Sequence, residues 1–234
     1  MELSDRQAVL QPDAAGEGTA SPRVLIVTAV AAERDAVLRG LKGSARFRVI
    51  AAGAGTAAAA AGTAAALAAG SYGCVISAGI GGGFPGRAPA GSLVVASEMI
   101  DAALGAETPE GFRSAAELGF GSVSVPADSG TVQALAAALA AAGLAVSTGP
   151  VLTVSTATGT AGTAAALAAR HPEAAAEAME GHGVAVAAHA LGIAVLELRA
   201  ISNPVGPRDR AAWKINEAMD ALTAAAAILL EVLQ

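Results

Sequence analysis

Short apolar runs alternate with segments of helical spacing along most of this chain. The runs are rich in Val, Leu and Ile and are bounded by Gly, Ser, Thr or a charge, which is typical of buried strands. The predicted strands are 24–27, 46–52, 74–77, 92–99, 150–155 and 195–201. The predicted helices are 31–41, 56–69, 131–142, 160–169, 174–191 and 213–233. This alternation predicts an α/β fold, a three-layer α/β/α sandwich with a central mixed sheet.

The pattern also predicts how the chain is divided. Residues 1–22 are polar with scattered Gly and Pro, and they lack the basic start and apolar centre of a signal peptide. We therefore expect a flexible N-terminal extension over 1–22. No boundary interrupts the pattern after it, so 23–234 is predicted to be a single catalytic domain, long enough to bury a sizeable core.

The composition of the chain excludes several classes of protein but does not change the predicted fold. Hydrophobic residues make up 54% of the chain and the mean hydropathy is +0.56, but alanine and glycine supply much of this and cut the apolar runs. No run reaches the ~20 apolar residues of a membrane-spanning helix. The net charge of -6 and pI near 5.0 argue against a nucleic-acid surface. The single cysteine, Cys74, excludes an internal disulfide and suits the cytoplasm.

Polar and glycine residues gather at the ends of three predicted strands, the edge where α/β proteins bind ligands. Glu33 falls in the first turn of a helix, where the helix dipole favours a carboxylate; the alternative is a general base. The segment SAGIGGGFPG (77–86), which includes Gly79, is predicted to be a loop whose backbone approaches a ligand. It lacks the Gly-Lys-Ser/Thr of a phosphate-binding loop.

At the third of these strand ends, the polar residues come from two segments, AMEGHG (178–183) and RAISN (199–203). Glu180 is a candidate for binding a ribose, and Asn203 for binding a heterocyclic base; the alternative for Asn203 is a loop cap before Pro204. His182 and His189 are seven residues apart, which does not suit the i, i+4 pairing of a helical zinc site. We expect no metal.

These motifs, in this order, resemble the nucleoside phosphorylase/hydrolase superfamily, and in particular the bacterial methylthioadenosine/adenosylhomocysteine nucleosidases. The resemblance runs from about residue 24 to the C-terminus. It implies that Glu33 activates the attacking water, that Met179 packs under the ribose and that Glu180 binds its hydroxyls. It implies no cofactor. It also implies a homodimer or higher homo-oligomer in which a neighbour's loop closes each pocket, with GAETPEGF (105–112) as the candidate loop.

The resemblance fails at two positions. The relatives stack the purine on a phenylalanine before the ribose glutamate, but 158–178 has no aromatic residue here. Phe112, Phe84 and Trp213 remain as replacements, and Phe112 is taken as the candidate. Asn203 stands where the adenine-specific enzymes have an aspartate. Because an amide donates and accepts at once, it suits the N7 and O6 edge of a 6-oxopurine.

We therefore expect an N-glycosyl hydrolase that acts on a small nucleoside and releases hypoxanthine. The segments 202–215 and 105–112 resemble such a hypoxanthine-releasing branch of the superfamily. Two alternatives stay open. A phosphorylase would use Arg87 and Arg199 to bind phosphate, and a non-catalytic module would bind a purine nucleoside without turnover.

Overall fold

The computed structural model describes residues 23–233, and the extension predicted for 1–22 lies outside them. Within this range the main sheet contains β1 (Arg23–Thr28), β2 (Phe47–Ala51), β3 (Tyr72–Gly83), β4 (Leu93–Asp101), β7 (Ser124–Pro126), β8 (Val146–Thr153), β9 (Ala176–Ala178) and β10 (Ala194–Pro204). A separate hairpin contains β5 (Gly105–Thr108) and β6 (Gly111–Ser114). The helices are α1 (Ala31–Leu41), α2 (Thr56–Ala68), α3 (Ser129–Ala141), α4 (Ala161–Arg170), α5 (Gly181–His189), the 3-10 turn η2 (Arg210–Ala212) and α6 (Ile215–Val232).

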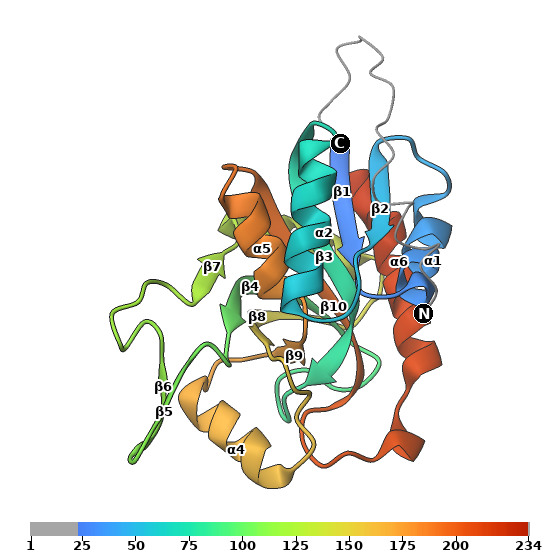
Figure 1. Ribbon diagram of the computed structural model, residues 1–234. Helices are drawn as coiled ribbons and strands as arrows, with labels where there is room; N and C mark the ends of the chain where they lie inside the picture. Colours follow the sequence, from blue (N-terminus) through green and yellow to red (C-terminus); the bar gives the residue numbers. More distant parts are fainter. Residues whose placement is uncertain (1–22, 234) are drawn as a thin grey trace.

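Helices cover both faces of this sheet, which confirms the predicted three-layer α/β/α fold (Figure 1). Side chains alternate along each strand. Val75 of β3 therefore joins the core under α2 and α5, while its neighbour Ile76 joins the core under α1, α3 and α6. The sheet is mixed, as expected. No helix between residues 23 and 233 is long and apolar enough to cross a bilayer.

The long strand β3 organises the sheet. It pairs in parallel with β1 and β10 and, at its carboxyl end, antiparallel with β9. Because β10 pairs with β4, β4 with β8 and β8 with β9, the pairing returns to β3 and closes on itself. This closure brings the carboxyl ends of β3 and β10 next to the turn that follows β9.

The glycine-rich segment corrects one prediction, because 77–83 is strand and not loop. A Cβ on Gly83 would lie 1.9 Å from the carbonyl oxygen of Ala88, and one on Gly81 would lie 2.8 Å from that of Glu177. These glycines are therefore needed for space between backbones, not for loop flexibility.

The helix predicted over 174–191 is confirmed only for its second half, Gly181–His189, and is wrong before it. The chain forms β9, turns at Met179 and Glu180, and only then begins α5 at Gly181. Ala176 pairs with Val151 of β8 and with Gly83 of β3, so backbone pairing overrides alanine's preference for helix. The turn carries the two residues that the sequence assigns to the ribose.

Candidate functional site

Glu33 belongs to the first turn of α1, and its carboxylate turns back toward the sheet. Its Oε2 accepts hydrogen bonds from the backbone N–H of Ala29 at 3.0 Å and of Val30 at 3.3 Å. Its Oε1 accepts one from the N–H of Ile80 on β3 at 2.9 Å. The side chain is only 4% exposed. Glu33 thus satisfies the start of its helix and also faces β3, so the two interpretations of this residue are compatible.

Burial raises the pKa of the Glu33 carboxyl above its ordinary value. The positive charge of Arg199 and the hydrogen bond from Ile80 partly offset this rise, while the negative charge of Glu180 adds to it. A carboxylate whose pKa is raised is a stronger base, which suits the removal of a proton from water.

Gly79 separates this carboxylate from a buried guanidinium. A Cβ at Gly79 would lie 2.6 Å from Oε1 of Glu33 and 2.8 Å from Nη1 of Arg199. The two charged groups therefore face each other across a missing side chain, at the middle of the site.

Glu180 completes the site from the turn after β9. Its Oε1 accepts a hydrogen bond from the N–H of Gly55 at 3.1 Å, and its Oε2 accepts from Nη1 of Arg199 at 3.3 Å. Gly55 has a φ of 93°, which favours glycine, and it caps the start of α2. Met179, half-buried, is fixed through its carbonyl, which accepts from Oγ1 of Thr56 at 3.3 Å. Glu180 is thus held between two helix starts.

Arg199 is 1% exposed and its donors reach three neighbours. Nε donates to Glu197 Oε1 at 2.8 Å, Nη2 to Ser77 Oγ at 2.8 Å, and Nη1 to Glu180. Burial opposes its charge, but the carboxylates of Glu197, Glu180 and Glu33 raise the pKa of Arg199 above its usual value. The guanidinium is therefore a fixed positive charge beneath the site.

These contacts bear on the phosphorylase alternative. All three guanidinium nitrogens of Arg199 already donate to protein groups. Arg87 is exposed, and its Nη2 donates to Glu173 at 3.0 Å and to the carbonyl of Pro172 at 2.9 Å. Arg199 is thus committed to buried protein groups and Arg87 to an exposed ion pair, so these contacts give no support to the phosphate site that a phosphorylase would need.

Asn203 lies further along the same strand pair. It pairs with Gly82, three residues beyond Gly79, which is roughly 10 Å along a strand. The register shifts between Ile201 and Asn203, and such a bulge changes the direction of the side chain that follows it. Its Oδ1 accepts from Ser202 Oγ at 2.7 Å and its Nδ2 donates to the carbonyl of Pro204 at 2.9 Å. The amide is half-exposed, near the surface of the site.

Phe112 is separate from this group. It belongs to the β5–β6 hairpin, which projects from the body of the molecule (Figure 1). Its ring contacts the guanidinium of Arg170 on α4, with the carbon of that group 4.2 Å from the ring centre. The structure therefore brings Glu33, Gly79 and Glu180 together with Met179 beside them, places Asn203 at the same strand end, and leaves Phe112 on the hairpin.

Sequence reasoning missed the polar groups beneath the site. Ser77 and Glu197 were not assigned a role, and Arg199 was considered only as a phosphate ligand. A signal was present: in Val-Leu-Glu-Leu-Arg-Ala-Ile (195–201) the two charges are two residues apart within an apolar strand. Residues at that spacing point to the same face, so a buried ion pair could have been predicted.

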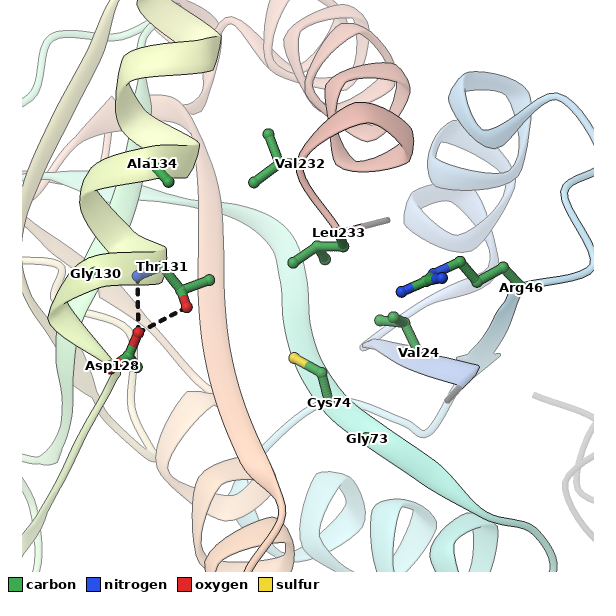
Figure 2. A pocket seen from close by; sticks show the side chains of 10 residues that line it. All are labelled: Val24, Arg46, Gly73, Cys74, Asp128, Gly130, Thr131, Ala134, Val232 and Leu233. Carbon is green, nitrogen blue, oxygen red and sulfur yellow. Dashed lines mark hydrogen bonds between the residues drawn. The ribbon is translucent and has the colours of Figure 1, made fainter. Parts of the chain in front are cut away.

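A cavity of about 450 Å³ lies at the opposite end of the strands, near the amino ends of β1 and β3 (Figure 2). It is lined by Val24, Arg46, Gly73, Cys74, Asp128, Gly130, Thr131, Ala134, Val232 and Leu233. Asp128 there caps α3, since its Oδ1 accepts from the N–H and the hydroxyl of Thr131. None of the candidate site residues lines this cavity, so it is not the candidate site.

Comparison with known proteins agrees with this geometry. The model of the phosphorylase superfamily matches residues 25–234. A futalosine hydrolase of Streptomyces coelicolor is 51% identical over 231 residues, covering 90% of this chain and 96% of the relative. A futalosine hydrolase of Acidothermus cellulolyticus is 48% identical over 222 residues, covering 89% and 91%.

Solved structures share the fold at much lower identity. The S-adenosylhomocysteine nucleosidase of Streptococcus pyogenes superimposes with a TM-score of 0.77 at 17% identity, covering 92% of this chain and 98% of its own. The methylthioadenosine/S-adenosylhomocysteine nucleosidase of Neisseria meningitidis superimposes with a TM-score of 0.74 at 18% identity, covering 91% and 99%.

Proposed function

The chain belongs to the phosphorylase superfamily, and on that basis we propose that it hydrolyses the N-glycosidic bond of futalosine. The products are hypoxanthine and dehypoxanthine futalosine, in the futalosine route of menaquinone biosynthesis. The observation that carries the chemistry is the buried Glu33 carboxylate facing the Arg199–Glu180 pair across Gly79. The substrate rests on the 51% and 48% identity to two futalosine hydrolases over about nine-tenths of the chain.

In the proposed mechanism, one group of residues acts on the water and the ribose, and Asn203 acts on the base. Cleavage builds positive charge on the ribose and negative charge on the departing purine. Water above Gly79 attacks C1′ and gives its proton to Glu33, while the C1′–N9 electron pair moves into the base. Glu180 binds the ribose hydroxyls. Arg199 donates to Glu180 and lowers the pKa of Glu33 against the effect of burial, which favours the ionised form of Glu33. A preorganised site of this kind stabilises charge as it develops.

Asn203 is assigned to the base. Its amide donates to N7 or O6 as charge accumulates on the purine, and the carbonyl of Pro204 and the hydroxyl of Ser202 already fix its orientation. A donating amide matches O6 of a 6-oxopurine, which is an acceptor, but not the N6 amino group of adenine, which is itself a donor. This favours a 6-oxopurine over adenine.

We further propose a homodimer or higher homo-oligomer in the cytoplasm. The β5–β6 hairpin projects from the body with Phe112 half-exposed, which is consistent with contact to a neighbouring subunit (Figure 1). Cys74 is a free thiol whose pKa burial raises to about 11, and a reducing compartment suits it.

The test is chromatographic measurement of hypoxanthine release from futalosine with and without phosphate, with inosine and methylthioadenosine in parallel. We expect rapid, phosphate-independent release from futalosine alone. Strict dependence on phosphate would favour the phosphorylase. Release of adenine from methylthioadenosine would contradict the role of Asn203, and binding without turnover of any of the three would favour the non-catalytic module.

A further inference from the structure

Glu197 is a carboxylate buried inside the sheet beneath the site. It is 0% exposed, in the middle of the apolar strand β10. Its Oε1 accepts from Nε of Arg199 at 2.8 Å, but its Oε2 has no hydrogen-bond partner. A buried oxygen without a partner costs free energy, so its presence in a native structure needs an explanation.

The space for the Glu197 carboxylate depends on a glycine in the facing helix. A Cβ at Gly181 would lie 2.1 Å from Oε2 and 2.3 Å from Oε1 of Glu197. Only glycine fits at this position while Glu197 keeps its place. Gly181 is the first residue of α5, so the carboxylate lies against the positive end of a helix, which favours an anion. Glu197 and Gly181 therefore fit each other as a pair.

The carboxyl groups around Arg199 come from three elements. Glu197 lies on the same strand as Arg199, Glu180 lies at the start of α5, and Glu33 faces the guanidinium from α1. Burial raises the pKa of Glu197, and the charge of Arg199 offsets part of this rise. Three carboxyl groups thus share one buried positive charge. The contact to Glu197, at 2.8 Å, is shorter than the 3.3 Å contact to Glu180. Glu197 therefore neutralises part of the charge that would otherwise act on the two carboxylates facing the substrate.

We propose that Glu197 is a positioning residue for the hydrolysis: it holds Arg199 between Glu33 and Glu180 and limits how strongly that guanidinium acts on Glu33. Glu197 itself is sealed from the substrate by Arg199 and Gly181. The inference rests on the proposed function, because it assigns to Glu33 the role of base. It explains why an unpaired carboxylate oxygen is kept: burial raises the pKa of Glu33, and the charge of Glu197 limits how far Arg199 lowers it again.

The decisive variant is Glu197→Gln, which keeps the shape and removes the charge. With less negative charge behind it, Arg199 stabilises ionised Glu33 more strongly. The acid limb of log kcat/KM for futalosine should then move to lower pH, by about half a unit or more. At neutral pH kcat should fall because the base is weaker, while KM should change less than about threefold since Glu197 does not touch the substrate.

Two control variants isolate this effect. Glu98→Gln changes a half-buried strand glutamate whose Oε2 accepts from the hydroxyl of Ser124, and it should leave the acid limb unmoved. His182→Gln identifies any contribution of that histidine, whose pKa burial lowers and Asp101 partly restores. The acid limb should persist in this variant.

The outcomes are distinguishable. If Glu197→Gln lowers kcat or the melting temperature without moving the acid limb, or moves it upward, Glu197 has only a structural role and the proposal is wrong. If the wild-type protein does not hydrolyse futalosine, the proposed function fails instead. If the variant does not fold, nitrogen-15 NMR of the wild type decides: the Nε–H of Arg199 should exchange slowly with water and shift as pH crosses the acid limb. Fast exchange or a pH-independent shift would overturn the proposal.

Discussion

Glu33 is the residue to which the proposed mechanism assigns the role of general base, and its carboxylate also caps helix α1. The change Glu33→Gln keeps the shape and one acceptor oxygen but removes the proton acceptor. The amide NH2 leaves either the N–H of Ile80 or the N–H groups of Ala29 and Val30 without an acceptor. We expect kcat for futalosine to fall by ~10²–10⁴, the usual contribution of a general base, with KM nearly unchanged. Steady-state kinetics on the purified variant check this. An unaltered kcat would remove Glu33 from the mechanism, and Glu173→Gln, at an exposed site, serves as the control.

The pH dependence follows from the burial of Glu33. Burial raises the pKa of this carboxyl, and catalysis requires its ionised form. Activity is therefore complete above the raised pKa and is lost as pH falls through it. The acid limb of kcat/KM should lie above about 4.3, the usual value for glutamate. A profile that stays flat down to that pH would show that burial does not set the basicity of Glu33.

The proposed base preference is assigned to Asn203. In Asn203→Asp the carboxyl group replaces the amide at the same place, so a proton can be supplied to an adenine ring. We expect hypoxanthine release from futalosine to fall by ~10-fold or more, the loss typical of a hydrogen bond that discriminates bases, and adenine release from methylthioadenosine to appear. Comparing kcat/KM for the two substrates measures this. A fall in hypoxanthine release with no adenine release from methylthioadenosine, as expected for Asn203→Ala, would mean that the residue only supports the loop.

A single sequence predicts those site residues that stand in short local motifs, but not the contacts between residues far apart in the chain. Glu33 and Glu180 stand in short motifs at strand ends, so a single sequence suffices to propose them. Their hydrogen bonds from Ile80 and Gly55, and the contact of Arg199 with Ser77, join residues 47 to 125 positions apart. Such contacts depend on strand register, which local pattern does not fix.

Among the elements, β3 shows two different uses of glycine. At Gly83 an added Cβ would meet a backbone carbonyl at 1.9 Å, but at Gly79 it would meet the ends of two side chains. Gly83→Ala should therefore lower the free energy of unfolding by about 1–3 kcal/mol or more. Gly79→Ala should cost less stability but abolish most activity, because it displaces Glu33 and Arg199. Denaturant unfolding and kinetics on both variants test this.

A control for these substitutions lies in α4. At Gly162 the nearest atom to an added Cβ is 4.0 Å away, so Gly162→Ala should stabilise the helix by up to about 1 kcal/mol. If Gly79→Ala and Gly83→Ala gave the same loss of stability with full activity, the division of roles along β3 would be wrong.

The elements also show why parts of the fold escaped prediction. Helix α1 was predicted with the bounds that the structure shows, because its apolar spacing and its acidic first turn are local signals. The segment 174–191 is alanine-rich and reads as helix, yet Ala176–Ala178 completes the sheet and Gly183 lies against the carbonyl of Thr56, where a Cβ would be 2.3 Å away. Close packing with β8 and α2, rather than propensity, determines this segment.

At the scale of the whole molecule, the hairpin and the site are separate parts of one chain. Phe112 contacts Arg170 of its own subunit, and its half-exposed ring lies on the projecting β5–β6 hairpin (Figure 1). If the proposed oligomer uses this hairpin, Phe112 serves the pocket of the neighbour rather than its own. Light scattering coupled to gel filtration should then give the mass of a dimer or a higher oligomer.

Mixing two inactive variants tests that arrangement. Glu33→Gln removes the base, and Phe112→Ala removes the aromatic ring from the hairpin. In a mixed dimer, the Phe112→Ala subunit keeps its Glu33 and receives an intact hairpin from its partner, so one of the two sites becomes complete. Refolding equal amounts of the two variants together gives mixed dimers for about half of the molecules, so activity should rise toward about a quarter of that of the wild type. Each variant refolded alone should stay inactive. Because a hairpin acting within its own subunit gives no complete site in any mixture, failure of the mixture to regain activity would assign Phe112 to its own subunit or to no pocket.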